Sequence, residues 1–451
     1  MKNIKHLGED RILALVVRYS APAIAGMVIY GLNRIVGNIF VGKFLGREAM
    51  AGFTVANSPV MILLSFIMLV GTGSSVLISM SLGRKDFSVA SRVLGTAVAV
   101  GFAFGLFLSA LMWIFTEPLL IAFGGEGKSL EYGAAFIRIY LAGSVFSFWN
   151  TTLNSAIRAE GQPGRALVTN IVSFLLNTAL TPVFLFAFPM GIKGVAMANI
   201  LSQFALTVWL GAHFFGKRTI LPLKPSSLKI DMSIAIRMCT LGSAPFFMQF
   251  LGACMSLVTN NIVRHLAGDL GLAVAGSVFS VYFLLIMPLQ GTSSGIQPII
   301  GYNFGASNHQ RVRRTVLVAL AFTAAICLVE MILAIGFRER LASLFTSGDT
   351  ALVAACAGGL LTILLAFPIA GVQFVASSFF LGTGKAKEAL AVNLFRSLFV
   401  LIPLLTLPQR FGMAGLFVSY PLVDVLVAVL GVILMFDGMK KASRPGLYTE
   451  R

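Results

Sequence analysis

Residues 291–305 read GTSSGIQPIIGYNFG: the stretch begins like an apolar membrane helix and ends with Gly and Asn, as a turn does. Residues 71–83, GTGSSVLISMSLG, have much the same plan. Gly71 and Gly291 lie 220 positions apart in a chain of 451 residues, which is about half its length. Two like segments at that spacing predict an internal duplication.

The composition is that of a protein embedded in a bilayer. The chain is 57% hydrophobic and 11% charged, whereas soluble domains carry about 25% charged residues. Apolar runs long enough to cross a bilayer as helices recur from end to end. The first run is too long for a cleaved signal peptide, so it counts as a span. The sequence therefore predicts an all-α integral membrane protein, multi-pass, in the plasma (cytoplasmic) membrane.

Twelve transmembrane helices are predicted, in two pseudo-symmetric six-helix lobes. The N-terminal lobe is residues 1–216, a cytoplasmic linker rich in Pro and Lys follows at 217–236, and the C-terminal lobe with a short tail is 237–451. The predicted spans are 14–40, 52–80, 92–115, 132–157, 165–187, 192–215, 237–264, 272–299, 313–337, 351–380, 389–407 and 413–437.

Short motifs recur at a nearly constant offset in the two halves. Ser-Ala-Pro stands at 20–22 and at 243–245, and ALVTN at 166–170 matches ALAVN at 389–393, both at offset 223. Gly191 matches Gly412 at offset 221. Because six spans are an even number, both halves should have the same orientation, with a pseudo-twofold axis along the membrane normal and a cavity between the lobes.

The net charge of +17 suggests nucleic-acid binding, but the placement of the charges argues against it. The Lys and Arg residues lie mainly in short loops between apolar runs. If the N-terminus is inside, inner regions hold about 23 of them and outer regions about 9, which predicts that both termini are cytoplasmic. We expect no nucleic-acid partner, and we expect a monomer in contact with membrane lipids.

The remaining composition argues against an enzyme or a receptor. The four Cys lie inside apolar runs without a C-x-x-C pair, and the four His are scattered, so no metal site is predicted. No nucleophile–base spacing appears in any span, which predicts no catalytic residues. No extramembrane domain is present that could transmit a signal as a receptor does.

Several motifs resemble those of the multidrug and toxic compound extrusion (MATE) family. They are SAPA at 20–23, IFVG at 39–42, GTGSS at 71–75, RAEGQP at 158–163, GIKG at 191–194 and QPIIGYNFG at 297–305 followed by Arg311-Val. The resemblance covers nearly the whole chain. It implies two six-helix lobes that export organic compounds in exchange for protons or sodium ions, without a cofactor.

The chain departs from that family pattern at two acidic positions. Many relatives carry Asp in a Val-Asp motif of span one, where this chain has Gly37, and Asp before the Pro of span five, where it has Thr181. The resemblance therefore carries no coupling carboxylate over to the first lobe. The segment RAEGQPG at 158–164 is predicted to be a tight turn between spans four and five, with a hinge as the alternative.

Two acids deep within spans are the candidates for cation coupling, Glu330 and Asp424; Glu117 lies near the end of span three. An ionisable group at that depth is costly unless it is paired or faces water, so it marks function by default. For Glu330 the alternative is a structural carboxylate bonded to a neighbouring helix. For Asp424 the alternative is a helix-packing contact, because its counterpart at offset 221 is the polar residue Gln203.

Two arginines are also predicted to be buried, Arg34 on span one and Arg396 on span eleven. A buried guanidinium needs an acid, carbonyl groups or an anionic ligand. Pairing with Glu330 or Asp424 is one possibility, and contact with a negative group of the substrate is the other.

Polar residues at helical spacing form stripes on spans four, five, seven and eight. Such faces contact protein or a water-filled cavity rather than lipid. They are predicted to line a transport path, with helix–helix adhesion as the alternative, and the 38 Phe and 18 Met suit an adaptable pocket,. The candidate cavity residues are Asn33, Arg34, Asn38, Asn154, Asn177, Gln249, Asn260, Gln290, Gln297, Gln373 and Arg396.

The function predicted from these observations is secondary active export of amphipathic, drug-like organic compounds. Export would be a cation-coupled antiport by alternating access, with a proton or a sodium ion as the coupling ion. The alternative is a flippase for lipid-linked oligosaccharides or related lipids, which shares the general fold and would use buried arginines to hold a pyrophosphate.

Overall fold

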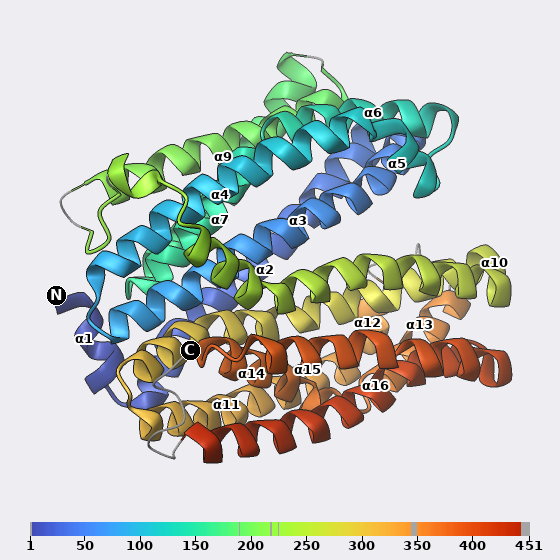
Figure 1. Cartoon of the computed structure of the whole chain (residues 1–451). Helices are drawn as coiled ribbons and strands as arrows, with labels where there is room; N and C mark the ends of the chain where they lie inside the picture. The colour runs from blue at the N-terminus through green and yellow to red at the C-terminus, as the bar shows by residue number, and fades with distance from the viewer. Residues whose placement is uncertain (1, 189, 217–218, 224, 344–349, 443–451) are drawn as a thin grey trace. The chain divides into compact units, whose positions relative to one another are not determined.

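The computed structural model describes residues 2–188, 190–216, 219–223, 225–343 and 350–442, and within these ranges all regular structure is helical (Figure 1). The helices are α1 Lys2–Glu9, α2 Ile12–Phe44, α3 Gly46–Gly83, α4 Phe87–Ile114, α5 Thr116–Ala122, α6 Gly127–Ala142, α7 Ser144–Ala159, α8 Pro163–Pro182, η1 Val183–Ala187, α9 Ile192–Phe215, η2 Pro225–Leu228, α10 Met232–Gly305, α11 His309–Gly336, α12 Arg338–Ser343, α13 Thr350–Ile363, α14 Phe367–Gly382, α15 Ala386–Phe399 and α16 Leu401–Ala442.

The twelve predicted spans are confirmed, although several are broken or fused. Among the described residues nine helices are long and apolar enough to cross a membrane, or ten if α13 and α14, bent by 54°, form one span. The segment Ala386–Lys440, which comprises α15 and most of α16, is counted as one span. Because α16 breaks at Gly412, this segment provides two spans. The helices α6 and α7 have 16 residues each and together form the remaining span, broken at Gly143.

The duplication extends to the conformation of single residues. Gly191 has φ 59° and ψ −137°, and Gly412, 221 positions later, has φ 56° and ψ −138°. The α6–α7 break at Gly143 matches the α13–α14 break at Ala366, 223 positions later, with φ −102° and −106°. The two halves of the chain therefore have the same backbone conformation at these equivalent positions.

The turns after α3 and α10 are also equivalent. Lys85 and Ser307 have φ 61° and 59°, and each precedes a capping residue. Asp86 Oδ1 accepts a hydrogen bond from the Val89 N–H at 3.0 Å, and Asn308 Oδ1 accepts one from the Arg311 N–H at 3.2 Å. The Gly and Asn residues at 301–305 are still helical, so the prediction that they form the turn was wrong: the chain turns at 306–308.

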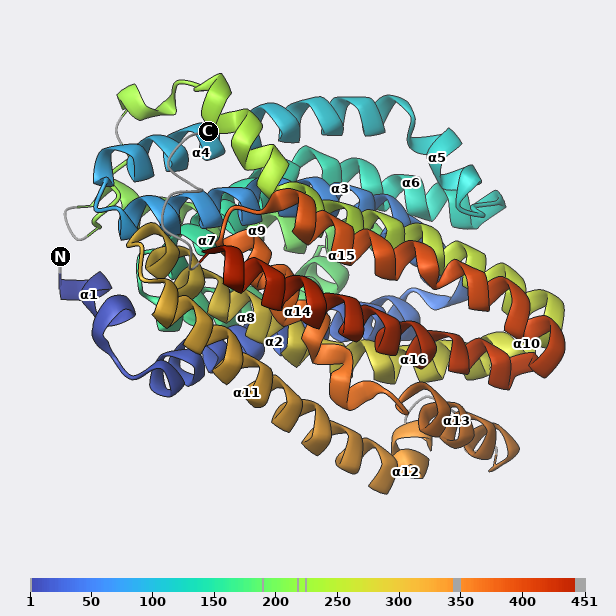
Figure 2. The ribbon, with the colours of Figure 1, turned by 60° about the horizontal axis from the view of Figure 1, so that its bottom comes forward.

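The chain divides into two compact units. Unit 1 comprises Met1–Glu9 and Ala25–Phe250, and unit 2 comprises Asp10–Ile24 and Leu251–Arg451. In unit 1, α3 packs against α4, α6 and α7. In unit 2, α14 packs against α11, α15 and α16 (Figure 2). The predicted lobe boundaries at 216 and 237 follow the repeat and stay a prediction; residues 217–218 and 224 of the predicted linker and 443–451 of the tail lie outside the described residues.

Glycine allows the helices within each unit to approach closely. A Cβ at Gly73 of α3 would lie 2.0 Å from the Met238 carbonyl oxygen at the start of α10. A Cβ at Gly295, 222 positions later, would lie 2.7 Å from Ser20 Cα in the first half of α2. Residues 232–250 at the start of α10 thereby belong to unit 1, and residues 12–24 at the start of α2 belong to unit 2.

Candidate functional site

A buried ion pair occupies the interior of unit 2. Arg396 on α15 donates from Nε to Asp424 Oδ1 on α16 at 2.9 Å and from Nη2 to Tyr282 Oη on α10 at 3.2 Å. The Tyr282 hydroxyl donates to Asp424 Oδ2 at 3.3 Å, and Asp424 is 5% exposed. The prediction that Arg396 pairs with an acid is confirmed for Asp424. Because the guanidinium and the carboxyl group lie against each other, neither is buried without a partner of opposite charge,.

Aromatic side chains surround this ion pair. The rings of Tyr282 and Tyr420 lie 6.2 Å apart, and Phe279 contacts Tyr420 edge-on at 5.2 Å. The Tyr420 hydroxyl lies 3.3 Å from Thr259 Oγ1. Sequence analysis missed both tyrosines, because each stands alone in an apolar run and belongs to no polar stripe; the buried acid four residues after Tyr420 was the one available signal.

Glu330 lies on α11 and is separate from the ion pair. It shares a helix face with Thr323, Cys327 and Ala334, all of them buried. That face packs against α14, where a Cβ at Gly371 would lie 2.3 Å from Thr323 Cγ2. Glu330 Oε2 is buried and makes no hydrogen bond to any described residue. Glu330 as a whole is half-buried.

The other unit 2 candidates differ in their surroundings. Gln373 is buried and donates from Nε2 to Asn393 Oδ1 at 3.2 Å. This bond joins α14 to α15, as expected if the polar residues hold helices together rather than line a transport path. Gln297 is also buried, but its Nε2 has no partner among the described residues. Gln290 is half-buried and Asn260 is exposed. The structure therefore brings together Arg396 and Asp424 and leaves the amides dispersed.

In unit 1 the candidates centre on the α7–α8 pair. Asn154 is buried and donates from Nδ2 to the Ala166 carbonyl at 3.1 Å and to Asn170 Oδ1 at 3.5 Å. Its Oδ1 accepts a hydrogen bond from the Arg158 guanidinium. Asn177 is buried as well, and its carbonyl accepts the Thr181 hydroxyl at 2.7 Å. The bonds from Asn154 to Ala166 and Asn170 join α7 to α8, whereas the Arg158–Asn154 and Thr181–Asn177 bonds each lie within one helix.

The remaining unit 1 candidates lie on α2 and α10. Asn33 is half-buried and its Oδ1 has no partner among the described residues, and Asn38 is half-buried too. Gln249 Nε2 lies 3.6 Å from Met61 Sδ. Arg34 is not covered by other side chains: it is exposed on α2, as are the large apolar residues Tyr30, Leu32 and Ile35 on the same helix.

Among the residues that the structure describes, no three His, Cys, Asp or Glu side chains are grouped so that they could hold a metal ion. The chemistry available at the site is that of a lone carboxyl group, a neutralised ion pair and dispersed amides.

Comparison with known proteins adds to this description. The family model MatE matches residues 22–183 and again residues 245–407. The multidrug export protein MepA of Staphylococcus aureus (strain MRSA252) is 22% identical over 435 residues, 96% of each chain. MepA of Staphylococcus saprophyticus is 22% identical over 436 residues, again 96% of each chain.

Solved structures share the fold. A MATE transporter in complex with MaL6 superimposes with a TM-score of 0.93 at 21% identity, covering 98% of this chain and 99% of that one. A multidrug resistance MATE family transporter of the MOP superfamily in an outward-facing conformation gives 0.92 at 21% identity, with the same coverage.

These matches agree with the apolar spans, which make the chain a multi-pass protein of the bacterial plasma membrane. Proteins of this kind are transporters of small molecules and not enzymes. Because the family model matches both halves of the chain, and solved MATE transporters share its fold over nearly the full length, the protein belongs to the MatE family of multidrug efflux transporters.

Proposed function

We propose that the protein is a secondary active exporter of amphipathic, drug-like organic compounds, driven by cation antiport through alternating access. Membership of the MatE family supports export, and the curated relatives that it matches are described as multidrug export proteins. A similar transporter solved in an outward-facing conformation supports alternating access.

One observation carries the coupling mechanism, the difference between Glu330 and Asp424. Asp424 is already compensated by Arg396, so binding a cation there would require the ion pair to break,. Glu330 Oε2 is buried without a hydrogen-bond partner among the described residues. We therefore assign the coupling ion to Glu330, with Asp424 in a supporting role.

The surroundings of Glu330 favour a proton as that ion. Hard metal cations bind in shells of several oxygen ligands. The groups on the same face include an alanine, a cysteine and Thr323, whose hydroxyl donates to the Ala319 carbonyl at 2.7 Å. A lone carboxyl group can bind a proton without further ligands, whereas a sodium ion would be poorly coordinated there.

The lipid-flippase alternative has less support. It requires a guanidinium that is available to a pyrophosphate, and Arg396 is engaged by Asp424 and Tyr282. Further parts of the proposal are a monomer, cytoplasmic termini and a substrate path past the half-buried amides Asn33, Asn38, Gln249 and Gln290.

Efflux from proteoliposomes tests this proposal. Purified protein would be reconstituted with several fluorescent amphipathic dyes inside, and the pH gradient and the sodium gradient would be imposed separately. We expect dye export that follows the pH gradient and stops when a protonophore collapses it. Export that responds to neither gradient would overturn antiport, and movement of lipid-linked pyrophosphates without dye export would favour the flippase.

A further inference from the structure

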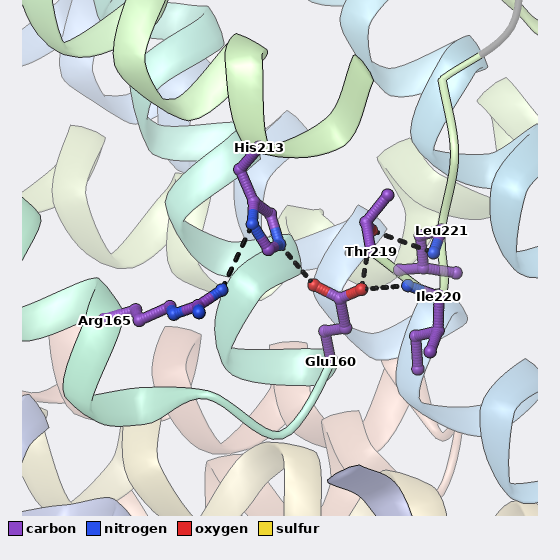
Figure 3. Close-up of polar contacts among 6 residues, drawn as sticks. All are labelled: Glu160, Arg165, His213, Thr219, Ile220 and Leu221. Carbon is purple, nitrogen blue, oxygen red and sulfur yellow. Dashed lines mark hydrogen bonds and ion pairs between the residues drawn. The ribbon is translucent and has the colours of Figure 1, made fainter. Parts of the chain in front are cut away.

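A fully buried carboxylate lies in unit 1, away from the sites described above. Glu160 follows α7 in the predicted turn at 158–164, and its side chain is 0% exposed. It accepts hydrogen bonds from His213 Nε2 at 2.8 Å, from Thr219 Oγ1 at 2.6 Å and from the Ile220 N–H (Figure 3). On the other side of the imidazole ring, Arg165 Nη1 lies 3.3 Å from His213 Nδ1.

Two of these partners belong to the segment that joins the repeats. We call residues 219–231 the strap, with residue 224 outside the described residues. Leu221 is fully buried, and the Leu223 N–H donates to the Phe214 carbonyl at 3.0 Å. The strap is therefore folded onto the end of α9 rather than extended as a free loop.

The second half of the strap lies against α4. A Cβ at Gly95 would lie 1.9 Å from the Ser227 carbonyl oxygen, so a glycine is needed for the strap to pass. Thr96 Oγ1 lies 3.5 Å from the Lys229 carbonyl and 3.4 Å from the Asp231 backbone nitrogen. The strap thus crosses the ends of α7, α9 and α4, all of them in unit 1.

The close packing continues beyond the strap into α10. A Cβ at Gly242 would lie 1.9 Å from the Leu69 carbonyl on α3, in addition to the contact between Gly73 and Met238. Unit 1 ends at Phe250, in the middle of a predicted span rather than in the linker. Residues 219–250 are therefore one continuous extension of unit 1.

We propose that Glu160 is a positioning residue for transport: it fastens the strap, so that the strap and residues 232–250 of α10 move with unit 1 as one body. The proposal rests on the proposed function, because it assumes that transport involves motion of the units. If the strap is released, the start of α10 is held to α3 by the close contacts at Gly73 and Gly242 without the added support of the strap. We expect the motion of α10 to follow the motion of unit 1 less strictly in that case.

The second repeat supports a role specific to the strap. The residue equivalent to Glu160 at offset 223 is Thr383, whose hydroxyl donates within its own helix to the Phe379 carbonyl at 2.8 Å. The turn itself is equivalent in both repeats, with Gly161 at φ 90° and Gly384 at φ 76°. In the first repeat, which the strap follows, this turn carries the acid Glu160. In the second repeat the same turn carries Thr383.

A labelling experiment tests whether Glu160 fastens the strap. In a full-length variant without its four native cysteines, Leu221→Cys places a thiol at a buried strap position. Glu160→Gln replaces an acceptor of three hydrogen bonds by an amide whose NH₂ group faces donors. We expect maleimide labelling of the purified protein to quicken at least about tenfold, because hydrogen bonds to a charged group are among the stronger ones. Glu131→Gln, at an exposed acid on α6, should label at the wild-type rate.

A second variant moves the strap without changing Glu160. Gly95→Leu inserts a side chain where the Ser227 carbonyl lies and should also quicken labelling. Both variants should slow dye export in proteoliposomes several-fold, while Glu131→Gln should export normally. If Glu160→Gln does not fold, Glu160→Asp, whose carboxylate is withdrawn by one methylene, should give intermediate labelling.

Each outcome decides a part of the proposal. Unchanged labelling in Glu160→Gln would show that Glu160 does not fasten the strap. Faster labelling with wild-type export would show that fastening is irrelevant to transport. If the wild type exports no dye, the proposed function fails and the positioning role fails with it, whereas the labelling rates still decide whether Glu160 holds the strap.

Discussion

Arg396 neutralises Asp424 through an Nε to Oδ1 contact of 2.9 Å within unit 2. At the position equivalent to Asp424, unit 1 has Gln203, whose side-chain oxygen accepts a hydrogen bond from Asn150 Nδ2. The two equivalent positions thus both make polar contacts to another helix, a charged one to α15 in unit 2 and a neutral one to α7 in unit 1.

Arg396→Gln should destabilise the protein more than it weakens substrate binding. Removing the guanidinium leaves the Asp424 carboxylate buried with the Tyr282 hydroxyl as its remaining partner. Breaking a buried pair costs on the order of 3 kcal/mol, and the partial exposure of Arg396 reduces that figure. Thermal unfolding in detergent measures the effect. The double variant Arg396→Leu/Asp424→Leu should recover much of the loss, and a double variant no more stable than the single one would contradict this explanation.

Glu330→Gln should abolish gradient-driven export without loss of folded protein. The amide keeps the shape of the protonated acid and cannot release a proton, so the transporter should remain in one protonation state. Counterflow of labelled substrate, which needs no net proton movement, should persist. Glu117→Gln is the matched control, because that acid is exposed and pairs with Arg138. Wild-type export by Glu330→Gln under an imposed pH gradient would exclude Glu330 as the coupling site.

Much of the fold was predictable from sequence, because the duplicated motifs recur at a nearly constant offset. Apolar runs and motif offsets gave twelve spans and two repeats, since both depend on local composition. The exchange of residues 12–24 of α2 and residues 232–250 of α10 between the units was not predictable. It depends on close approaches at Gly73 and Gly295, and glycine in a membrane helix is consistent with many packings,.

The candidate site was less predictable than the fold. Composition identified Glu330 and Asp424, because an acid within an apolar run is conspicuous. The partners of Asp424 come from two other helices, α10 and α15, and no spacing in the sequence relates Tyr282 to Arg396. Glu160 was overlooked for a different reason: turn chemistry alone explained its neighbourhood, while its partners lie more than fifty positions further along the chain.

Gly191→Ala and Gly412→Ala should each destabilise the protein through the backbone alone. Both residues have positive φ, 59° and 56°, and a Cβ at either would meet nothing within 4 Å. The cost is therefore conformational, about 1–3 kcal/mol for a non-glycine residue held in such a region. Thermal unfolding measures it, and equal losses at the two sites would reflect the shared geometry. A variant as stable as the wild type would mean that the turn adapts.

Gly73→Ala and Gly295→Ala should destabilise units 1 and 2 respectively by overpacking. The new methyl group would lie 2.0 Å from the Met238 carbonyl in one case and 2.7 Å from Ser20 Cα in the other, so backbone must shift. Such strain costs about 1–3 kcal/mol. Elsewhere in a helix, replacing Gly by Ala is favourable by up to about 1 kcal/mol.

The sign of the change distinguishes close packing from helix propensity. Gly211→Ala on α9 and Gly276→Ala on α10 are the matched controls, because a Cβ at either would meet nothing within 4 Å. We expect these two variants to unfold at or slightly above the wild-type temperature, and the variants at Gly73 and Gly295 to unfold below it. If all four variants shift in the same direction, the glycines at 73 and 295 do not hold the exchanged half-helices in place.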